Sequence, residues 1–211
     1  MNKKITNILN KKRKSKIVSL TAYSKNIAEI LDKYCDIVLV GDSMANVLYG
    51  HKDTHKISLQ NIIQHTLSVK KGIKKSLLVV DMPKGSYSNK SLALKNARKI
   101  MNLTRCDAVK IESNNKNFSI IYELVKAKIP VMGHIGFTPQ FQKKFKIQGD
   151  SINGINKLLK EALTIEKAGA FSIVLECLTP KASKLITKNL KIPTIGIGSS
   201  SNCDGQILVT D

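Results

Sequence analysis

Five short apolar runs in the sequence each end at a residue that can bind a metal ion, carry a charge or transfer a proton. The first run occupies residues 36–43 and stops at a glycine followed by Asp42. The other four end at Asp81, Glu112, His134 and Glu176. Continuous apolar runs of this length are typical of strands buried on both faces of a parallel sheet. Because parallel strands place their carboxyl ends at the same edge, we expect these five side chains to lie close together.

Three of these residues form a candidate metal site. Asp42, Asp81 and Glu112 offer hard oxygen ligands from neighbouring strands, which suits Mg²⁺ with water and substrate completing the coordination. Zinc is disfavoured because the sequence has no cluster of histidines and cysteines, and its four cysteines are far apart. Lys110 stands two residues before Glu112, so both side chains point to one face of a strand. A lysine there either neutralises an anionic substrate at the metal or forms a structural ion pair.

Glu176 and His134 are candidates for proton transfer and substrate binding. Glu176 ends a strand that carries none of the metal ligands, between apolar neighbours that can raise a carboxyl pKa. It is therefore a candidate general base, and the alternative is an ion pair inside a barrel. His134 stands in the segment Gly133–Gly136, which we interpret as a turn. There the imidazole either donates to a substrate carboxylate or stabilises the turn itself.

The charge of the chain is strongly positive, with a formal net charge of +20 from 35 Lys+Arg and 15 Asp+Glu residues. Nearly all of these cations are lysine, whereas proteins that read nucleic acid usually exploit the arginine fork. We therefore expect a solvated basic surface that steers anionic small molecules, and no nucleic-acid partner. No run approaches the roughly 18 apolar residues of a membrane span, and the N-terminus lacks the apolar core of a signal peptide. The expectation is a soluble, cytoplasmic protein with no membrane partner.

The apolar periodicity predicts strands that alternate with helices or loops. The expected strands lie at residues 17–23, 36–40, 76–80, 108–112, 129–134, 173–176, 192–198 and 205–209. The expected helices lie at residues 24–34, 58–71, 90–103, 118–127, 155–168 and 181–189. Eight strands in this order predict a (β/α)₈ TIM barrel, with an open doubly wound sheet as the alternative. We expect one domain over residues 1–211, in which 1–16 form a basic leader with a short helix and 136–149 form a long lid or binding loop.

Several blocks of the sequence, in unbroken order from residue 16 to the end, resemble the ketopantoate hydroxymethyltransferase family. They are Val40–Ser43, Tyr49–His51, Val109–Glu112, Gly133–Gln140, Lys146–Gly149, Leu175–Cys177, Ile195–Gly198 and Asp204–Leu208. The resemblance implies a barrel of the phosphoenolpyruvate/pyruvate type. It also implies transfer of a one-carbon unit from 5,10-methylenetetrahydrofolate to 3-methyl-2-oxobutanoate, through a Mg²⁺-stabilised enolate, in pantothenate and coenzyme A biosynthesis. By position, the family's metal ligands match Asp42, Asp81 and Glu112, its oxoacid contacts match Asp42, Ser43, Asp81 and Lys110, and its base matches Glu176.

The chain departs from the family pattern in two ways. Ala45, Lys84 and Ser199–Ser200 replace residues of other types near the folate pocket, while the metal ligands and the base are retained. The family also continues past the eighth strand with covering helices, whereas this sequence ends at Asp211. We therefore expect an uncovered outer face at Ile207 or Leu208. The chain is then either aggregation-prone and weakly active alone, or it buries this face in a homo-oligomer of the large kind, including decamers, that the family forms.

Two other functions fit the same residues. One is a related Mg²⁺-dependent oxoacid lyase or mutase of the same barrel superfamily, which folate dependence would separate from the transferase. The other is an inactive barrel that acts through a partner chain. Retention of the complete set of acidic residues and Lys110 argues against a decayed site.

Overall fold

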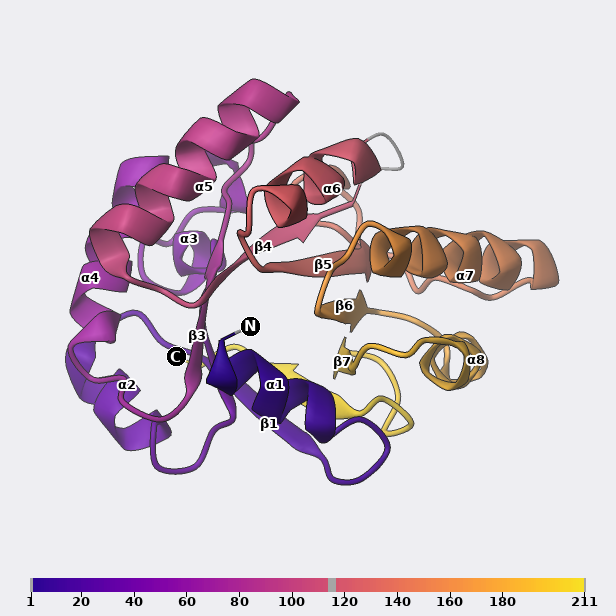
Figure 1. The fold of residues 1–211 in the computed structure, drawn as a ribbon. Coiled ribbons are helices and arrows are strands. Elements are labelled where there is room, and N and C mark those ends of the chain that lie inside the picture. Colours follow the sequence, from indigo (N-terminus) through magenta and orange to yellow (C-terminus); the bar gives the residue numbers. More distant parts are fainter. Residues whose placement is uncertain (1, 114–116, 211) are drawn as a thin grey trace.

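The apolar runs form the strands of a closed parallel barrel, in which each strand pairs with the next and β8 pairs with β1 (Figure 1). The computed structural model describes residues 2–113 and 117–210. The strands are β1 Ile17–Thr21, β2 Ile37–Val40, β3 Leu77–Asp81, β4 Ala108–Glu112, β5 Val131–Gly136, β6 Ser172–Glu176, β7 Thr194–Ile197 and β8 Gly205–Leu208. The helices are α1 Lys3–Asn10, α2 Lys25–Leu31, α3 Met44–Val47, the 3₁₀ helix η1 Thr54–Lys56, α4 Leu59–Lys70, α5 Lys90–Thr104, α6 Phe118–Lys126, α7 Ile152–Lys167 and α8 Pro180–Asn189. The expected (β/α)₈ barrel is confirmed.

The strands are apolar on both faces because each face packs against a different part of the core. Residues such as Ile37, Leu39 and Val79 point inward and fill the barrel. Their neighbours Val38 and Val40 point outward and pack under the surrounding helices. All of the side chains of β2, β3 and β4 are therefore buried, which explains why the sequence shows continuous runs rather than alternation.

Helix α1 lies across one end of the barrel (Figure 1). Its buried residues Ile5 and Ile8 belong to the same apolar cluster as the barrel interior. The N-terminal segment is also bound to the residues that precede the strands, because Lys4 Nζ donates to the carbonyl of Ser76 and Lys12 Nζ lies 2.7 Å from Asp204 Oδ2. This end is the amino-terminal end of the strands, so α1 closes the barrel opposite the candidate site.

Some boundaries differ from those expected, for local reasons. The segment Gly133–Gly136 is the end of β5 and not a turn, because its backbone pairs with β6. Two short helices, α3 and η1, occupy a segment expected to be a loop, since pieces of three or four residues carry no periodicity. Helix α7 begins at Ile152, where the Ser151 side chain caps it by accepting from the backbone of Gly154.

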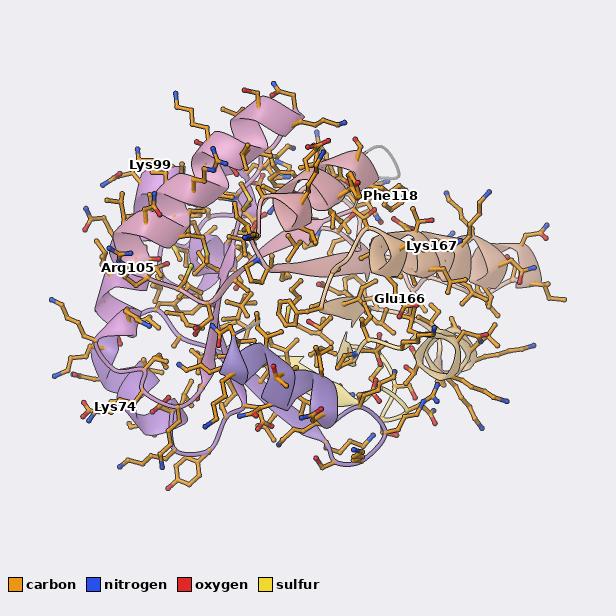
Figure 2. All side chains as sticks on the ribbon, viewed as in Figure 1. Lys74, Lys99, Arg105, Phe118, Glu166 and Lys167 are labelled. Atoms are coloured by element: carbon orange, nitrogen blue, oxygen red, sulfur yellow. The ribbon has the colours of Figure 1, made fainter. Side chains whose placement is uncertain are left out.

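The surface of the barrel carries the lysines. Figure 2 shows Lys74, Lys99 and Lys167 extending from the outer helices and their connections, and all three are exposed. The outer face of β1 and β8 differs, because it exposes apolar side chains instead: Val18 is 46% exposed and Leu208 is 61% exposed. Of the two residues expected on that face, Ile207 points into the barrel and Leu208 points outward. Within residues 2–113 and 117–210, no helix has the length and apolar character needed to cross a membrane.

Candidate active site

The register of the barrel brings the predicted site residues together at the carboxyl ends of the strands. Asp81 pairs with Lys110, Glu112 with His134, and Gly136 with Glu176. A cavity of about 520 Å³ opens at this end of the barrel. All of the predicted residues line it, namely Asp42, Ser43, Asp81, Lys110, Glu112, His134 and Glu176.

Three buried carboxylates and one ammonium group form one side of the cavity. Asp42 follows β2, and Asp81 and Glu112 are the last residues of β3 and β4. Lys110 Nζ lies 2.7 Å from Asp81 Oδ1, and both side chains are less than 10% exposed. The backbone N–H of Asp42 donates to Asp81 Oδ2 at 3.0 Å. The two readings of Lys110 are thus compatible, because the same lysine forms an ion pair and faces the cavity.

The electrostatics of this cluster oppose the simultaneous ionisation of all three carboxyl groups. Burial, followed by the nearby charge of Asp81, raises the pKa of Asp42 to about 7. Burial also raises the pKa of Glu112 well above its ordinary value, although Lys110 opposes the shift. Burial alone would lower the pKa of Lys110, but the three surrounding carboxylates raise it instead, so the lysine stays charged. One cation against three carboxylates favours the binding of a further cation.

The donor set fits a hard divalent ion that keeps part of its water shell. Among the described residues, no three His, Cys, Asp or Glu side chains converge as a preformed metal cage. Mg²⁺ does not need such a cage, because it usually binds through one or two carboxylates with water and substrate oxygens. The carboxylates of Asp42, Asp81 and Glu112 supply that chemistry, together with the unbalanced charge.

His134 and Glu176 form the opposite side of the cavity. His134 Nε2 lies 3.1 Å from Glu176 Oε2, and His134 Nδ1 lies 3.7 Å from Glu112 Oε1. Neither contact meets strict hydrogen-bond geometry, although the Glu176 carboxylate is close enough to Nε2 to oppose the lowering of the His134 pKa. Burial, followed by the charge of Lys110, lowers the pKa of His134, so the ring is neutral near pH 7. The Glu176 side chain is 17% exposed and opens toward the cavity.

Three basic side chains and one further carboxylate also line the cavity. They are Lys52, His55, Lys143 and Asp53. His55 Nε2 contacts the carbonyl oxygen of Pro139 at 3.0 Å, and Lys84 Nζ lies 3.2 Å from the His55 ring nitrogens. Lys84, which departs from the family pattern, therefore contacts a residue that lines the cavity without lining it itself. Deeper in the cavity, Ser43 Oγ is hydrogen bonded to the Tyr23 hydroxyl at 2.8 Å.

Two residues of the site were not predicted from the sequence. Gln140 is buried and bonds to Asp42 and Glu112, and Tyr87 is buried and donates to Gln140. Gln140 closes the Gly133–Gln140 block, so the block itself was a signal. Tyr87 lies in the connection between β3 and α5, with no strand end or motif to mark it.

Fold and site together define a (β/α)₈ barrel with an acidic cavity at the carboxyl ends of its strands, a fold that solved members of the PEP mutase/isocitrate lyase superfamily share. The solved structure of a phosphoenolpyruvate phosphomutase from Streptomyces platensis subsp. rosaceus is similar, with a TM-score of 0.76 and 11% identity, over 98% of this chain and 79% of that one. A phosphonopyruvate hydrolase in complex with oxalate and Mg²⁺ matches with a TM-score of 0.71 and 12% identity, over 92% and 71% of the two chains. At these identities the similarity concerns the fold.

The particular family follows from the sequence comparisons. The model of the family described as ketopantoate hydroxymethyltransferase matches residues 2–211. A 3-methyl-2-oxobutanoate hydroxymethyltransferase from Pelagibacter ubique is 54% identical over all of this chain and 82% of its own length. The chain belongs to the ketopantoate hydroxymethyltransferase family, and the transferase class expected from the resemblance is confirmed.

Proposed function

We propose that this chain transfers a hydroxymethyl group from 5,10-methylenetetrahydrofolate to 3-methyl-2-oxobutanoate, giving 2-dehydropantoate (ketopantoate). The observation that carries the proposal is the division of the cavity: buried carboxylates with Lys110 on one side, and Glu176 beside a neutral His134 on the other. An oxoacid needs both sides, because its keto and carboxylate oxygens require cations and its C3–H requires a base.

Asp42, Asp81 and Glu112 would hold Mg²⁺. The ion, when bound, supplies Lewis-acid polarisation of the keto oxygen of the oxoacid. The complex of a similarly folded phosphonopyruvate hydrolase with oxalate and Mg²⁺ supports this choice. Lys110 offers a fixed positive charge to the anionic substrate, and Ser43 offers a hydroxyl group at the cavity wall.

Glu176 removes the C3 proton as the general base. The electron pair of the C3–H bond moves into a C2–C3 double bond, and the keto oxygen gains negative charge beside Lys110. His134, whose ring nitrogens lie between Glu176 and Glu112, donates a hydrogen bond to a substrate oxygen. C3 then forms the new bond to the methylene carbon, and both bonds from that carbon to the folate nitrogens break. One water supplies the oxygen and hydrogen of the new hydroxyl group, and its second proton, together with the proton taken from C3, goes to the two released nitrogens, so that the products are tetrahydrofolate and the hydroxymethylated oxoacid.

The basic side chains of the cavity suit the folate. The glutamate end of a folate is anionic, and Lys52 and Lys143 stand where it would leave the cavity. We also propose that the chain works as a homo-oligomer in the cytoplasm, and that residues 1–211 act as one domain.

The proton step is tested with Glu176→Gln, which keeps the shape of the side chain but cannot take a proton. In deuterated water with oxoacid and Mg²⁺, we expect NMR to show exchange of the C3 proton slowed by about 10²–10⁴-fold, with Mg²⁺ and oxoacid affinity retained. Asp81→Asn should instead lose both ion binding and exchange, because it removes a ligand charge. Glu29→Gln, on the exposed side of α2, is the matched control. If Glu176→Gln exchanged the C3 proton at the wild-type rate, another residue would have to be the general base, and His134 would be the next candidate.

The alternative within the same fold is a Mg²⁺-dependent oxoacid lyase or mutase. It predicts turnover of an oxoacid without folate, so an assay of ketopantoate formation with and without 5,10-methylenetetrahydrofolate separates the two. The inactive-barrel alternative predicts no C3 exchange at all in the wild-type protein.

A further inference from the structure

Gln140 contacts the ends of three neighbouring strands at once. Its side-chain Nε2 donates to Asp42 Oδ2 at 2.8 Å and to the carbonyl of Met82 at 3.0 Å. Its backbone N–H donates to Glu112 Oε2 at 2.9 Å. The residue is 1% exposed, so these bonds are made without competition from bulk water. One residue therefore fixes the orientation of a carboxylate after β2 and of another at the end of β4.

A buried phenol fixes which way the Gln140 amide points. The Tyr87 hydroxyl donates to Gln140 Oε1, which leaves Nε2 to face Asp42. Burial raises the pKa of Tyr87, so the phenol keeps its proton and remains a donor. The amide is thus held at both ends, and the donor toward Asp42 is specified by a neighbouring side chain.

Gln140 belongs to the long connection between β5 and α7, most of which is exposed. Residues 143–147, which begin three positions after it, are all exposed and include Lys143, Lys144 and Lys146. Pro139, directly before it, is held by His55 at the rim of the cavity. The loop therefore has a buried anchor at Gln140 and an accessible basic segment a few residues later.

We infer that Gln140 is a positioning residue that couples the order of the β5–α7 loop to the binding of a divalent cation by Asp42 and Glu112. The inference rests on the proposed function, since it concerns the proposed metal site. An ion that draws these carboxylates into one arrangement favours the loop position in which Gln140 donates to both. By linkage, a loop anchored through Gln140 favours the ion to the same extent.

The test measures ion binding and loop order without turnover. Mn²⁺ binding is followed by the electron paramagnetic resonance signal of the free ion, in the wild type and in Gln140→Ala. We expect affinity to fall by about 10–100-fold, as is usual when a group that orients metal ligands is removed. Trypsin cleavage after Lys143, Lys144 and Lys146 should be slowed by Mn²⁺ in the wild type and not in Gln140→Ala.

Gln142→Ala is the matched control, because Gln142 lies on the same loop and its side chain, among the residues that the structure describes, is hydrogen bonded to Gly136 and Thr138 and not to the carboxylates. It should bind Mn²⁺ like the wild type. Tyr87→Phe, which removes only the hydroxyl that orients the amide, should weaken Mn²⁺ in the same direction by a smaller factor, and serves if Gln140→Ala fails to fold. If Gln140→Ala and Tyr87→Phe both kept the wild-type Mn²⁺ affinity and the protection from trypsin by Mn²⁺, the coupling would be overturned but the metal site would stand. A wild type that binds no Mn²⁺ would overturn the proposed metal site, and the coupling with it.

Discussion

At the scale of single residues, the site buries three carboxyl groups whose negative charges would repel one another. Asp42, Asp81 and Glu112 are buried together, and Lys110 is the charged partner that the structure places among them. The cost of ionising all three appears in the raised pKa of Asp42 and of Glu112. A bound divalent ion would remove that cost, so stability and ion binding are linked through the same carboxylates.

The repulsion among these buried carboxylates makes the metal-free protein less stable as the pH rises. A carboxyl pKa near 7 in the folded chain, against about 4 in the unfolded chain, means that the folded state holds more protons between those values. Stability therefore falls from about pH 4 to pH 7. We expect the melting temperature in EDTA to drop by at least about 3 °C between pH 5 and pH 8, since 1 kcal/mol corresponds to roughly 2–4 °C for a chain of this length.

Asp42→Asn isolates the contribution of this carboxyl. In EDTA the variant should melt above the wild type at pH 8, and the difference should shrink toward pH 5. Added Mg²⁺ should stabilise the wild type at pH 8 and the variant much less. If the melting temperatures of wild type and variant differed by the same amount from pH 5 to pH 8, the folded structure would not oppose the ionisation of Asp42.

The sequence allowed the charged members of the site to be predicted but not their contacts. Asp42, Asp81, Glu112 and Glu176 each stop an apolar run, and that local signal survives in a single sequence. The role of Gln140 depends on a loop from β5 reaching over β2 to β4, which no local pattern encodes. His134 was placed in a turn because glycines flank it, whereas in β5 those glycines permit close packing.

At the scale of elements, Gly136 shows how tightly β5 and β6 approach beside the proposed base. Its φ is +95°, a conformation that L side chains rarely adopt. A Cβ atom there would lie 2.1 Å from the carbonyl oxygen of Glu176 and 2.3 Å from Leu178 Cδ1. The glycine therefore sets both the end of β5 and the position of the Glu176 backbone.

Gly136→Ala should therefore lower the free energy of unfolding by more than the backbone strain of an alanine at positive φ accounts for. Gly85→Ala is the matched control, because Gly85 also has a positive φ, of +83°, but has no atom within 4 Å of the added Cβ. We expect Gly85→Ala to lower the free energy of unfolding by about 1–3 kcal/mol, and Gly136→Ala by roughly 1–3 kcal/mol more. Urea denaturation measures the free energy of unfolding of both variants. Equal decreases would show that the backbone at Glu176 moves away from the added Cβ atom at little cost.

Most elements were predictable because their amphipathic or apolar patterns are long enough to read. Helix α4 is an example, since Ser58 caps it as expected through a reciprocal pair of bonds with Asn61. The short helices α3 and η1 escaped prediction, because their conformation follows from the loop they sit in rather than from periodicity.

At the scale of the whole molecule, the barrel is asymmetric in how its outer surface is covered. Helices and lysines surround most of it (Figure 2). Strands β1 and β8 instead contain no charged residue, and their outer face exposes Val18 and Leu208, which are two register positions apart because Val18 pairs with Gln206 and Leu208 pairs with Leu20. For a chain with a formal charge of +20, an uncharged apolar face is where two copies can meet with least repulsion.

We therefore predict that a second copy of the chain covers the face formed by Val18 and Leu208. Burying a leucine or valine stabilises by roughly 1.5–3 kcal/mol relative to exposure, so association should raise the melting temperature with protein concentration. Leu208→Glu should shift the protein toward monomer in sedimentation velocity and remove the concentration dependence. Ile30→Glu, at a residue of α2 that is 55% exposed, should do neither. A wild type that stays monomeric across a dilution series and melts above about 60 °C, near the top of the mesophile range, would contradict the prediction, because the exposed face would then need no cover.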